Sequence, residues 1–174
     1  MRTFEPITLV EKDLTRELDE LEHFLKQNPQ LRERKHVLPF FKARKQLCAA
    51  LGLMNANVDV PDRVANELVL FGDFACDAAA GDSKNNSFTL IEFEDANEHS
   101  IFSKLETGKS VKRWSSRFEH GFSQLVDWAW RLSRENATTT AFRDIFGKNH
   151  AKIHLLLVAG RDADLTDDDV ARLT

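Results

Sequence analysis

The stretch that decides the fold reads LFGDFACD at residues 70–77 and, after a turn, TLIEFE at residues 89–94. Both halves have the apolar composition of β-strands, and we expect strands over residues 67–80 and 87–94. The residues between them, GDSKNNS at 81–87, favour a reversal of the chain. The sequence therefore predicts a pair of neighbouring strands.

Four acidic residues interrupt these strands. Because side chains alternate between the two faces of a strand, Asp73 and Asp77 are predicted to share one face, and Glu92 and Glu94 another. Up to four carboxylates would then converge, and like charges this close need protons or a cation to offset their repulsion. For Asp73 alone, a solvated position in a turn or at a strand entry is the favoured interpretation. For Asp77 and Glu92 we favour a functional role, since an inward carboxylate without a partner is costly.

The remaining hydrophobic pattern predicts helices on either side of a mixed sheet. The expected helices cover residues 12–27, 38–51, 115–134, 139–146 and 164–173, and a further buried strand covers residues 152–159. Residues 52–61 and 95–112 are expected to be a connection and a loop. This order of elements is typical of an α/β sandwich in which the hairpin is antiparallel and the last strand returns through a helix.

Composition limits the class of protein. The chain has 174 residues, 42% hydrophobic and 30% charged, with a net charge of −4, which is ordinary for a globular domain. We expect one domain, with residues 1–60 its helical N-terminal part and residues 61–174 its α/β core, or a fragment of a longer protein. No signal peptide or membrane span is evident, so we expect a cytoplasmic protein with no membrane partner, and Cys48 and Cys76 reduced and buried.

The acidic pattern resembles a known nuclease motif. An acid on one strand followed on the next by Glu-x-(Lys or Glu) is the metal-binding core of PD-(D/E)XK nucleases, and Asp77, Glu92 and Glu94 fit it. More narrowly, the chain resembles the Shedu anti-phage nuclease family over roughly residues 14–173. The segments that carry the resemblance are GDFACD (72–77), LIEFED (90–95), GFSQLVDW (121–128) and LLLVAGR (155–161).

The resemblance implies a restriction-endonuclease-like PD-(D/E)XK core and a set of site residues. Asp77 and Glu92 would be catalytic and bind Mg²⁺ or Mn²⁺, a hard cation that prefers oxygen ligands. Glu94 would be catalytic at the position where many such nucleases have lysine, and Gln124 would be turned toward the site by its helix. From the residues alone, Gln124 could equally form a structural hydrogen bond.

A basic cluster follows the second acidic strand. We expect contacts with a DNA backbone from Lys112, Arg113, Trp114 and Arg117, although an ordinary solvated surface is the competing interpretation for each lysine.

The resemblance as a whole implies an Mg²⁺-dependent DNA endonuclease that acts in bacterial antiviral defence as a homo-oligomer. Two alternatives stay open. In one, the nuclease fold is catalytically inactive and serves DNA binding, sensing or assembly, with Glu94 marking a lost site. In the other, the acids bind a stabilising cation in a structural or regulatory protein. Zinc-like His and Cys spacing, a phosphate-binding glycine loop and a Gly-x-Ser-x-Gly elbow are all missing from the sequence.

Overall fold

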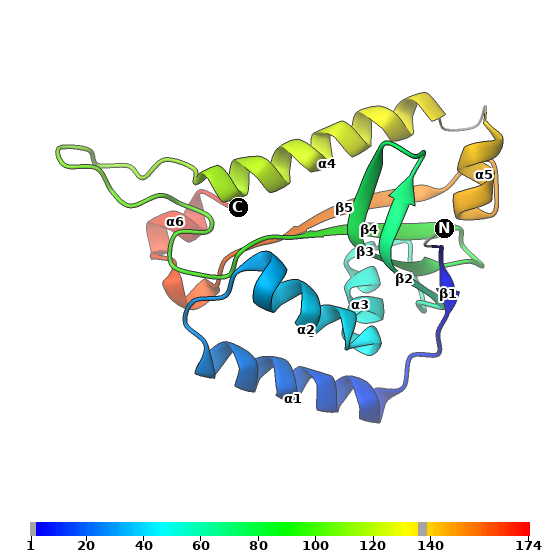
Figure 1. Ribbon diagram of the computed structural model, residues 1–174, viewed down its shortest axis with the longest axis horizontal. Coiled ribbons are helices and arrows are strands. Elements are labelled where there is room, and N and C mark those ends of the chain that lie inside the picture. The colour runs from blue at the N-terminus through cyan, green and yellow to red at the C-terminus, as the bar shows by residue number, and fades with distance from the viewer. Residues whose placement is uncertain (1–2, 136–138) are drawn as a thin grey trace.

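A computed structural model describes residues 3–135 and 139–174, and it has a five-stranded sheet with helices on both faces (Figure 1). The strands are β1 (Glu5–Pro6), β2 (Arg63–Leu70), β3 (Phe74–Asp82), β4 (Ser87–Phe93) and β5 (Lys152–Val158). The helices are α1 (Glu11–Gln27), α2 (Leu38–Lys42), α3 (Lys45–Leu51), α4 (Ser116–Glu135), α5 (Thr140–Phe146) and α6 (Asp167–Ala171). A π-helical turn at Glu33–Val37 leads into α2, and short 3₁₀ turns lie at Gly52–Met54 and Asp162–Asp164.

The sheet is mixed, as the order of elements predicts. Its strands follow in the order β1-β2-β3-β4-β5; the first four are antiparallel to their neighbours, and β5 is parallel to β4. A parallel return needs a crossover, which here contains α4 and α5. In Figure 1, α1, α2 and α3 lie on one side of the sheet, and α4 lies on the other.

The central strand β4 separates two hydrophobic cores. Every residue of β4 is buried, which explains its nearly continuous apolar composition. Phe88 and Leu90 belong to a core with Trp128 of α4, whereas Ile91 and Phe93 belong to a core with residues of the N-terminal helices. By the same alternation, Glu92 faces α4. The fold therefore carries the acids of β4 to the underside of that helix.

One predicted strand is wrong in its extent. The expected strand over 67–80 is two strands, because β2 ends at Leu70 and β3 begins at Phe74. Phe71 and Gly72 have φ of 56° and 82°, a left-handed turn in which glycine is favoured. Asp73 lies in this turn, so it does not share a strand face with Asp77.

The helices agree with the hydrophobic periodicity except near residue 43 and at the last helix, where α6 is shorter than the predicted range 164–173 and begins after its cap residue Thr166. The predicted helix over 38–51 is divided into α2 and α3, since Arg44 is non-helical and its side chain reaches back to the Phe40 carbonyl at 3.0 Å. The ends of α5 follow their caps: the Thr139 hydroxyl accepts a bond from the Phe142 N–H, and Gly147 closes the helix with φ of 81°.

Two further observations concern the cysteines and the lengths of the helices. Cys48 and Cys76 are buried and free. Within residues 3–135 and 139–174, every helix is too short or too polar to cross a bilayer.

Candidate metal and active site

A polar hollow of about 390 Å³ opens between the sheet, α4 and the π-helical turn. Three of the four catalytic residues expected from the sequence line it: Asp77, Glu92 and Gln124. Its other polar lining residues are Glu33, Arg34, Lys42, Glu67 and His120. The structure thus brings together groups that lie far apart in the sequence.

Asp77 marks the point where β3 and β4 separate. The ladder between the strands ends at the pair Ala78 and Ile91, and beyond it the Asp77 carboxylate accepts a bond from the Phe93 N–H at 2.9 Å. The Asp77 side chain therefore replaces the next backbone hydrogen bond of the β3–β4 ladder, and the two strands separate at this point. Burial raises the pKa of Asp77 to about 6, against the lowering effect of the Phe93 N–H.

Glu92 is the most perturbed carboxyl group in the hollow. It is buried, and its Oε2 has no hydrogen-bond partner among the described residues. Burial first, and then the carboxylates of Asp77, Glu33 and Glu94, raise the pKa of Glu92 to about 9. At neutral pH such a group either keeps its proton or faces a cation.

Glu94 lies just beyond β4 and beneath the first half of α4. Its Oε1 is 2.9 Å from His120 Nδ1, and burial raises the pKa of Glu94 despite that contact. The helix can approach because residue 121 is glycine: a Cβ there would lie 2.6 Å from Leu157 Cδ1 and 3.0 Å from Glu94 Cγ. The sequence prediction placed Glu94 near the site without revealing this histidine partner.

Glu33 is the acidic residue that sequence reasoning missed. Glu33, Glu94 and Asp95 each place one carboxylate oxygen within 4.8 Å of the others, which is the spacing of a possible cation site. Arg117 Nη1 lies 3.6 Å from Glu33 and 3.8 Å from Glu94, and Arg117 Nε lies 3.7 Å from Asp95. The motif ERKHV has no periodicity that would indicate an inward acid; only the structure reveals it.

The expected patch of four converging carboxylates is therefore corrected. Asp77 and Glu92 share one hollow, and Glu94 lies with Glu33 and Asp95 at its border. Asp73 lies in the turn between β2 and β3, 3.2 Å from Arg131. This is the position in a turn that the sequence analysis favours for Asp73.

The donor set suits a hard cation. In the part of the chain that the structure describes, buried side-chain atoms without a hydrogen-bond partner include Glu92 Oε2, Glu94 Oε2 and Gln124 Oε1. The unpartnered oxygens of Glu92 and Gln124 line one hollow and are donors of the kind that Mg²⁺ or Mn²⁺ takes together with water molecules. Among the described residues, the three-carboxylate spacing of a possible cation site belongs instead to Glu33, Glu94 and Asp95, beside Arg117.

Basic side chains of the π-helical turn lie beside the acidic cluster formed by Glu33, Glu94 and Asp95. A second hollow shares Glu33 and His120 with the first, so the two are adjacent, and it is lined by Arg32, Arg34 and Lys35. The side chain of Arg34 is 92% exposed. We call the two adjacent hollows together the trough, and we call Arg32, Arg34 and Lys35 its basic rim.

The four residues expected to contact DNA have different surroundings. Lys112 pairs with Asp169 at 2.6 Å, and Trp114 is stacked between Phe102 and Phe118. Arg113 is largely exposed and lies 3.4 Å from Glu106. Arg117 is the one that faces the acidic centre.

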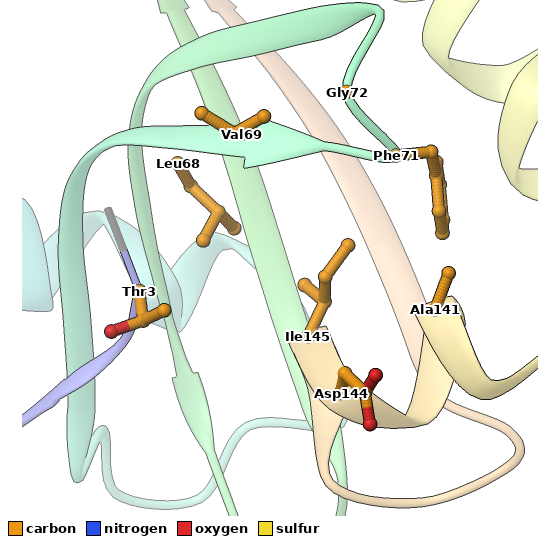
Figure 2. A pocket seen from close by; sticks show the side chains of 8 residues that line it. All are labelled: Thr3, Leu68, Val69, Phe71, Gly72, Ala141, Asp144 and Ile145. Carbon is orange, nitrogen blue, oxygen red and sulfur yellow. The ribbon is translucent and has the colours of Figure 1, made fainter. Parts of the chain in front are cut away.

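A separate apolar pocket lies between the β2–β3 turn and α5 (Figure 2). Figure 2 shows Leu68, Phe71 and Ile145 around it, with Asp144 at its border. Of the described residues that line this pocket, Asp144 alone is charged, so the lining offers few groups for a metal or a phosphate chain. The polar trough is the better candidate for chemistry.

Comparison with protein families gives one match that covers most of the chain. A family model described as Shedu protein SduA, C-terminal, matches residues 16–174. Comparisons with curated proteins and with solved structures give no match.

Proposed function

The chain belongs to the Shedu family, in the C-terminal part of the SduA protein, and on this premise we propose that it is a metal-dependent DNA endonuclease of anti-phage defence. The proposed core is of the PD-(D/E)XK type. The observation that carries the proposal is the pair of half-buried Asp77 and buried Glu92, which line one hollow where β3 leaves β4 and have raised pKa values, with an unpartnered oxygen on Glu92. Perturbed acids in a hollow are a recognised sign of a functional site.

The sheet supports the same assignment. An antiparallel β2-β3-β4 meander followed by a helix and a parallel β5 provides the strand–strand–helix–strand order that the motif requires. Asp77, Glu92 and Gln124 come from three different elements and line one hollow, which supports the proposal.

Each residue then has a definite task. Asp77 and Glu92 would hold the cation, with Glu33 and Glu94 available beside them. When bound, such a cation polarises a phosphate and lowers the pKa of a coordinated water. Gln124, whose Oε1 is buried and unpartnered, would accept a hydrogen bond from a water molecule of the site.

Arg117 provides positive charge near Glu94, and His120 provides a ring nitrogen beside the same carboxylate. In many related nucleases the position of Glu94 is a lysine, and a glutamate there cannot offer a cation. The His120 ring lies 2.9 Å from Glu94 Oε1 and is well exposed to the trough, so its Nε2 is accessible to a substrate phosphate. We infer that the Glu94–His120 pair takes over part of the role of the missing lysine.

The basic rim suggests how DNA would bind. Arg32, Arg34 and Lys35 line the trough beside the acids, where a phosphate backbone needs neutralising. Replacing Arg34 with alanine should weaken DNA binding about uniformly across sequences and reduce the salt slope by about 1. Arg16→Ala, at an exposed position of α1, is the matched control and should leave binding unchanged.

The decisive experiment measures cleavage of supercoiled and linear DNA with Mg²⁺, Mn²⁺ or EDTA. The parent chain should cut only with metal, and Asp77→Asn and Glu92→Gln should each abolish cutting. Glu98→Gln, whose side chain is exposed, should cut like the parent. Cleavage that persists in both site variants, or in EDTA, would contradict the proposal.

The same assay tests the alternative function, a catalytically inactive nuclease fold. Arg117 lies among Glu33, Glu94 and Asp95, where it partly neutralises the acids without any metal. This contact favours an inactive nuclease fold that binds DNA or serves assembly. Salt-dependent binding without cleavage, by a folded chain that retains metal affinity, would support this alternative.

A further inference from the structure

Lys42 lines the same hollow as Asp77 and Glu92, although it comes from the other side of the sheet from α4. It is the last residue of α2, and its ammonium group donates a hydrogen bond to the carboxylate of Glu67 on β2. The Lys42 side chain is 39% exposed, so its ammonium group can also meet a molecule that enters the hollow. Burial raises the pKa of Asp77, and the charge of Lys42 acts in the opposite direction. Lys42 is therefore a cation close to the acids of the site.

The backbone at Glu67 is distorted in a way that a strand does not require. Glu67 has φ of 53°, a left-handed conformation that is uncommon for a residue other than glycine. The ladder between β2 and β3 keeps one register on both sides of this point, and Glu67 and Asp77 are the two opposed residues that it skips. Such a conformation costs free energy, and residues that adopt it cluster at functional sites.

The distortion interrupts the alternation of side chains in both strands. Residues three apart in a regular strand face opposite sides of the sheet. Here each strand has two residues three apart that both belong to the core beneath α4, namely Ala65 and Leu68 in β2 and Cys76 and Ala79 in β3. Glu67 and Asp77 lie at the two interruptions, and both side chains line the hollow. The same irregularity therefore brings the catalytic acid Asp77 and the partner of Lys42 to one place.

An ammonium group in this position suits the hydrolysis of a phosphodiester. Water attacks the phosphorus atom and gives up a proton, the P–O bond to the leaving group breaks, and the leaving oxygen gains a proton. Negative charge grows on the phosphate oxygens meanwhile, and a fixed cation beside them lowers the barrier. An ammonium group has three N–H donors, so the bond to Glu67 leaves others for a phosphate oxygen. Lys42 keeps its protons and forms no covalent bond in this step.

Two other cations of the trough are less suited to this task. Arg117 lies within 4 Å of three carboxylates, which offset its charge, and the Arg34 side chain is 92% exposed. We propose that Lys42 is a catalytic residue that donates a hydrogen bond to the phosphate being cleaved, and that Glu67 is the residue that positions it. Lys42 would supply the positive charge that Glu94 cannot offer. This inference rests on the proposed nuclease function and deepens it.

The test is cleavage of linear DNA in Mg²⁺ with the whole chain in excess, beside DNA affinity measured by fluorescence anisotropy in EDTA. Lys42→Met should lower the cleavage rate at saturating protein about 100- to 1000-fold, the loss expected when one donor to the transition state is removed. The Kd for DNA should change less than about 5-fold, since one phosphate contact among several is lost. Lys45→Met, which breaks an exposed ion pair with Glu5 outside the hollow, is the matched control and should cut like the parent.

Chemical rescue separates the charge of Lys42 from its packing. Lys42→Cys, treated with 2-bromoethylamine, carries an ammonium group on a side chain of nearly the original length, and it should regain at least about 10-fold in rate over the untreated variant. Cys48 and Cys76 are buried, so the thiol at position 42 is the accessible one. Treatment with iodoacetamide, which adds a neutral group, should give no recovery. Equal recovery with both reagents would overturn the role of the charge.

A double-mutant cycle tests the positioning role of Glu67. Glu67→Gln should slow cleavage about 3- to 10-fold, and in the Lys42→Met background it should have no further effect, because the group that it positions is gone. Full additivity of the two losses would overturn this role. Glu5→Gln, in the control pair, should have no effect in either background.

The outcomes separate this inference from the proposed function. If the parent cuts DNA and Lys42→Met cuts at the same rate, the role of Lys42 is overturned and the nuclease function stands. If Lys42→Met is slow only below saturation, because its DNA affinity has fallen in proportion, Lys42 is a binding residue and its catalytic role is overturned. A parent that cuts no DNA with metal contradicts the proposed function and this inference together.

Discussion

The charge of Glu92 leads to a prediction about the stability of the metal-free protein. Its pKa is raised from 4.5 to about 9, mainly by burial and then by the carboxylates around it. At neutral pH the folded chain therefore holds a proton at Glu92 that the unfolded chain has released. By linkage, the free energy of unfolding falls as the pH rises from about 4.5 through about 9.

The magnitude follows from the width of that window. At pH 7 the whole effect on one isolated group would be about 3 kcal/mol. Because the hollow opens to solvent and the titration of Asp77 is coupled to that of Glu92, we expect the loss in the free energy of unfolding to be about 1–2 kcal/mol. Glu92→Gln keeps the shape of the side chain and removes its charge. It should stabilise the metal-free protein by this amount at pH 7, which corresponds to a Tm higher by about 2–8 °C.

The assay is thermal unfolding in EDTA, followed by calorimetry from about pH 5 to about pH 8, across the window in which Glu92 changes its charge on unfolding. The difference between Glu92→Gln and the parent should be small at the acidic end and should grow as the pH rises. Glu98→Gln, whose side chain is 67% exposed, should differ from the parent by less than about 0.5 kcal/mol at every pH. A Glu92→Gln variant that is less stable than the parent at pH 8, or a difference independent of pH, would refute the reasoning.

Adding metal should reverse the order of the two proteins. Mg²⁺ at about 100 times its Kd should stabilise the parent by about 2.7 kcal/mol, whereas Glu92→Gln, with one ligand oxygen lost, should gain far less. Equal stabilisation of both proteins would show that Glu92 does not bind the ion.

Three further perturbations test how the site is supported. Gly121→Ala should lower the free energy of unfolding by about 1–2 kcal/mol in denaturant titrations, because its Cβ would meet Leu157 Cδ1 at 2.6 Å; unchanged stability would show that α4 is free to move outward. Trp128→Ala should cost about 3–5 kcal/mol, since its side chain is buried in the core beneath α4, and a cost below about 1 kcal/mol would contradict that packing. Lys112 first, and then the backbone of Thr166, lower the pKa of Asp169 to about 2, so the stability that this carboxylate contributes is present above about pH 4 and is lost as the pH falls through about 2. Asp169→Asn should therefore increase hydrogen exchange in α6 at neutral pH, and exchange equal to that of the parent would count against a role for the ion pair.

The sequence was sufficient for most of the elements, but not for β1, for the π-helical turn, or for the breaks within residues 38–51 and 67–80. Periodicity correctly predicted α1, α4 and β5, and the turn residues placed the β3–β4 hairpin. It failed at Phe71, a bulky residue with positive φ, because apolar residues on both sides of Gly72 conceal the turn. The glycine was the available signal, and tertiary packing decided the rest.

The candidate site was predictable in part for the same reason. Asp77, Glu92 and Gln124 could be placed at one site because strand alternation and the resemblance to a known motif point to the same face. Glu33 could not, since its inward direction depends on a π-helical turn that is fastened by a hydrogen bond from the Glu33 N–H to Asp95. His120 could not be identified from the sequence either, because a histidine near a helix start gives no sign of its partner until the tertiary fold is known.

The dependence of β4 on β5 bears on when a newly made chain could become active. During translation Asp77 and Glu92 leave the ribosome well before β5 (Lys152–Val158), yet β3 parts from β4 at Ala78, and the other edge of β4 at Glu92 is held by Leu157. A nascent chain without β5 has the acids but no strand to hold Glu92 in place. If the proposed nuclease function holds, a growing polypeptide should be unable to cut DNA until residue 158 has emerged. Stalled chains that end before and after β5, compared for metal binding, would show whether synthesis itself provides this delay.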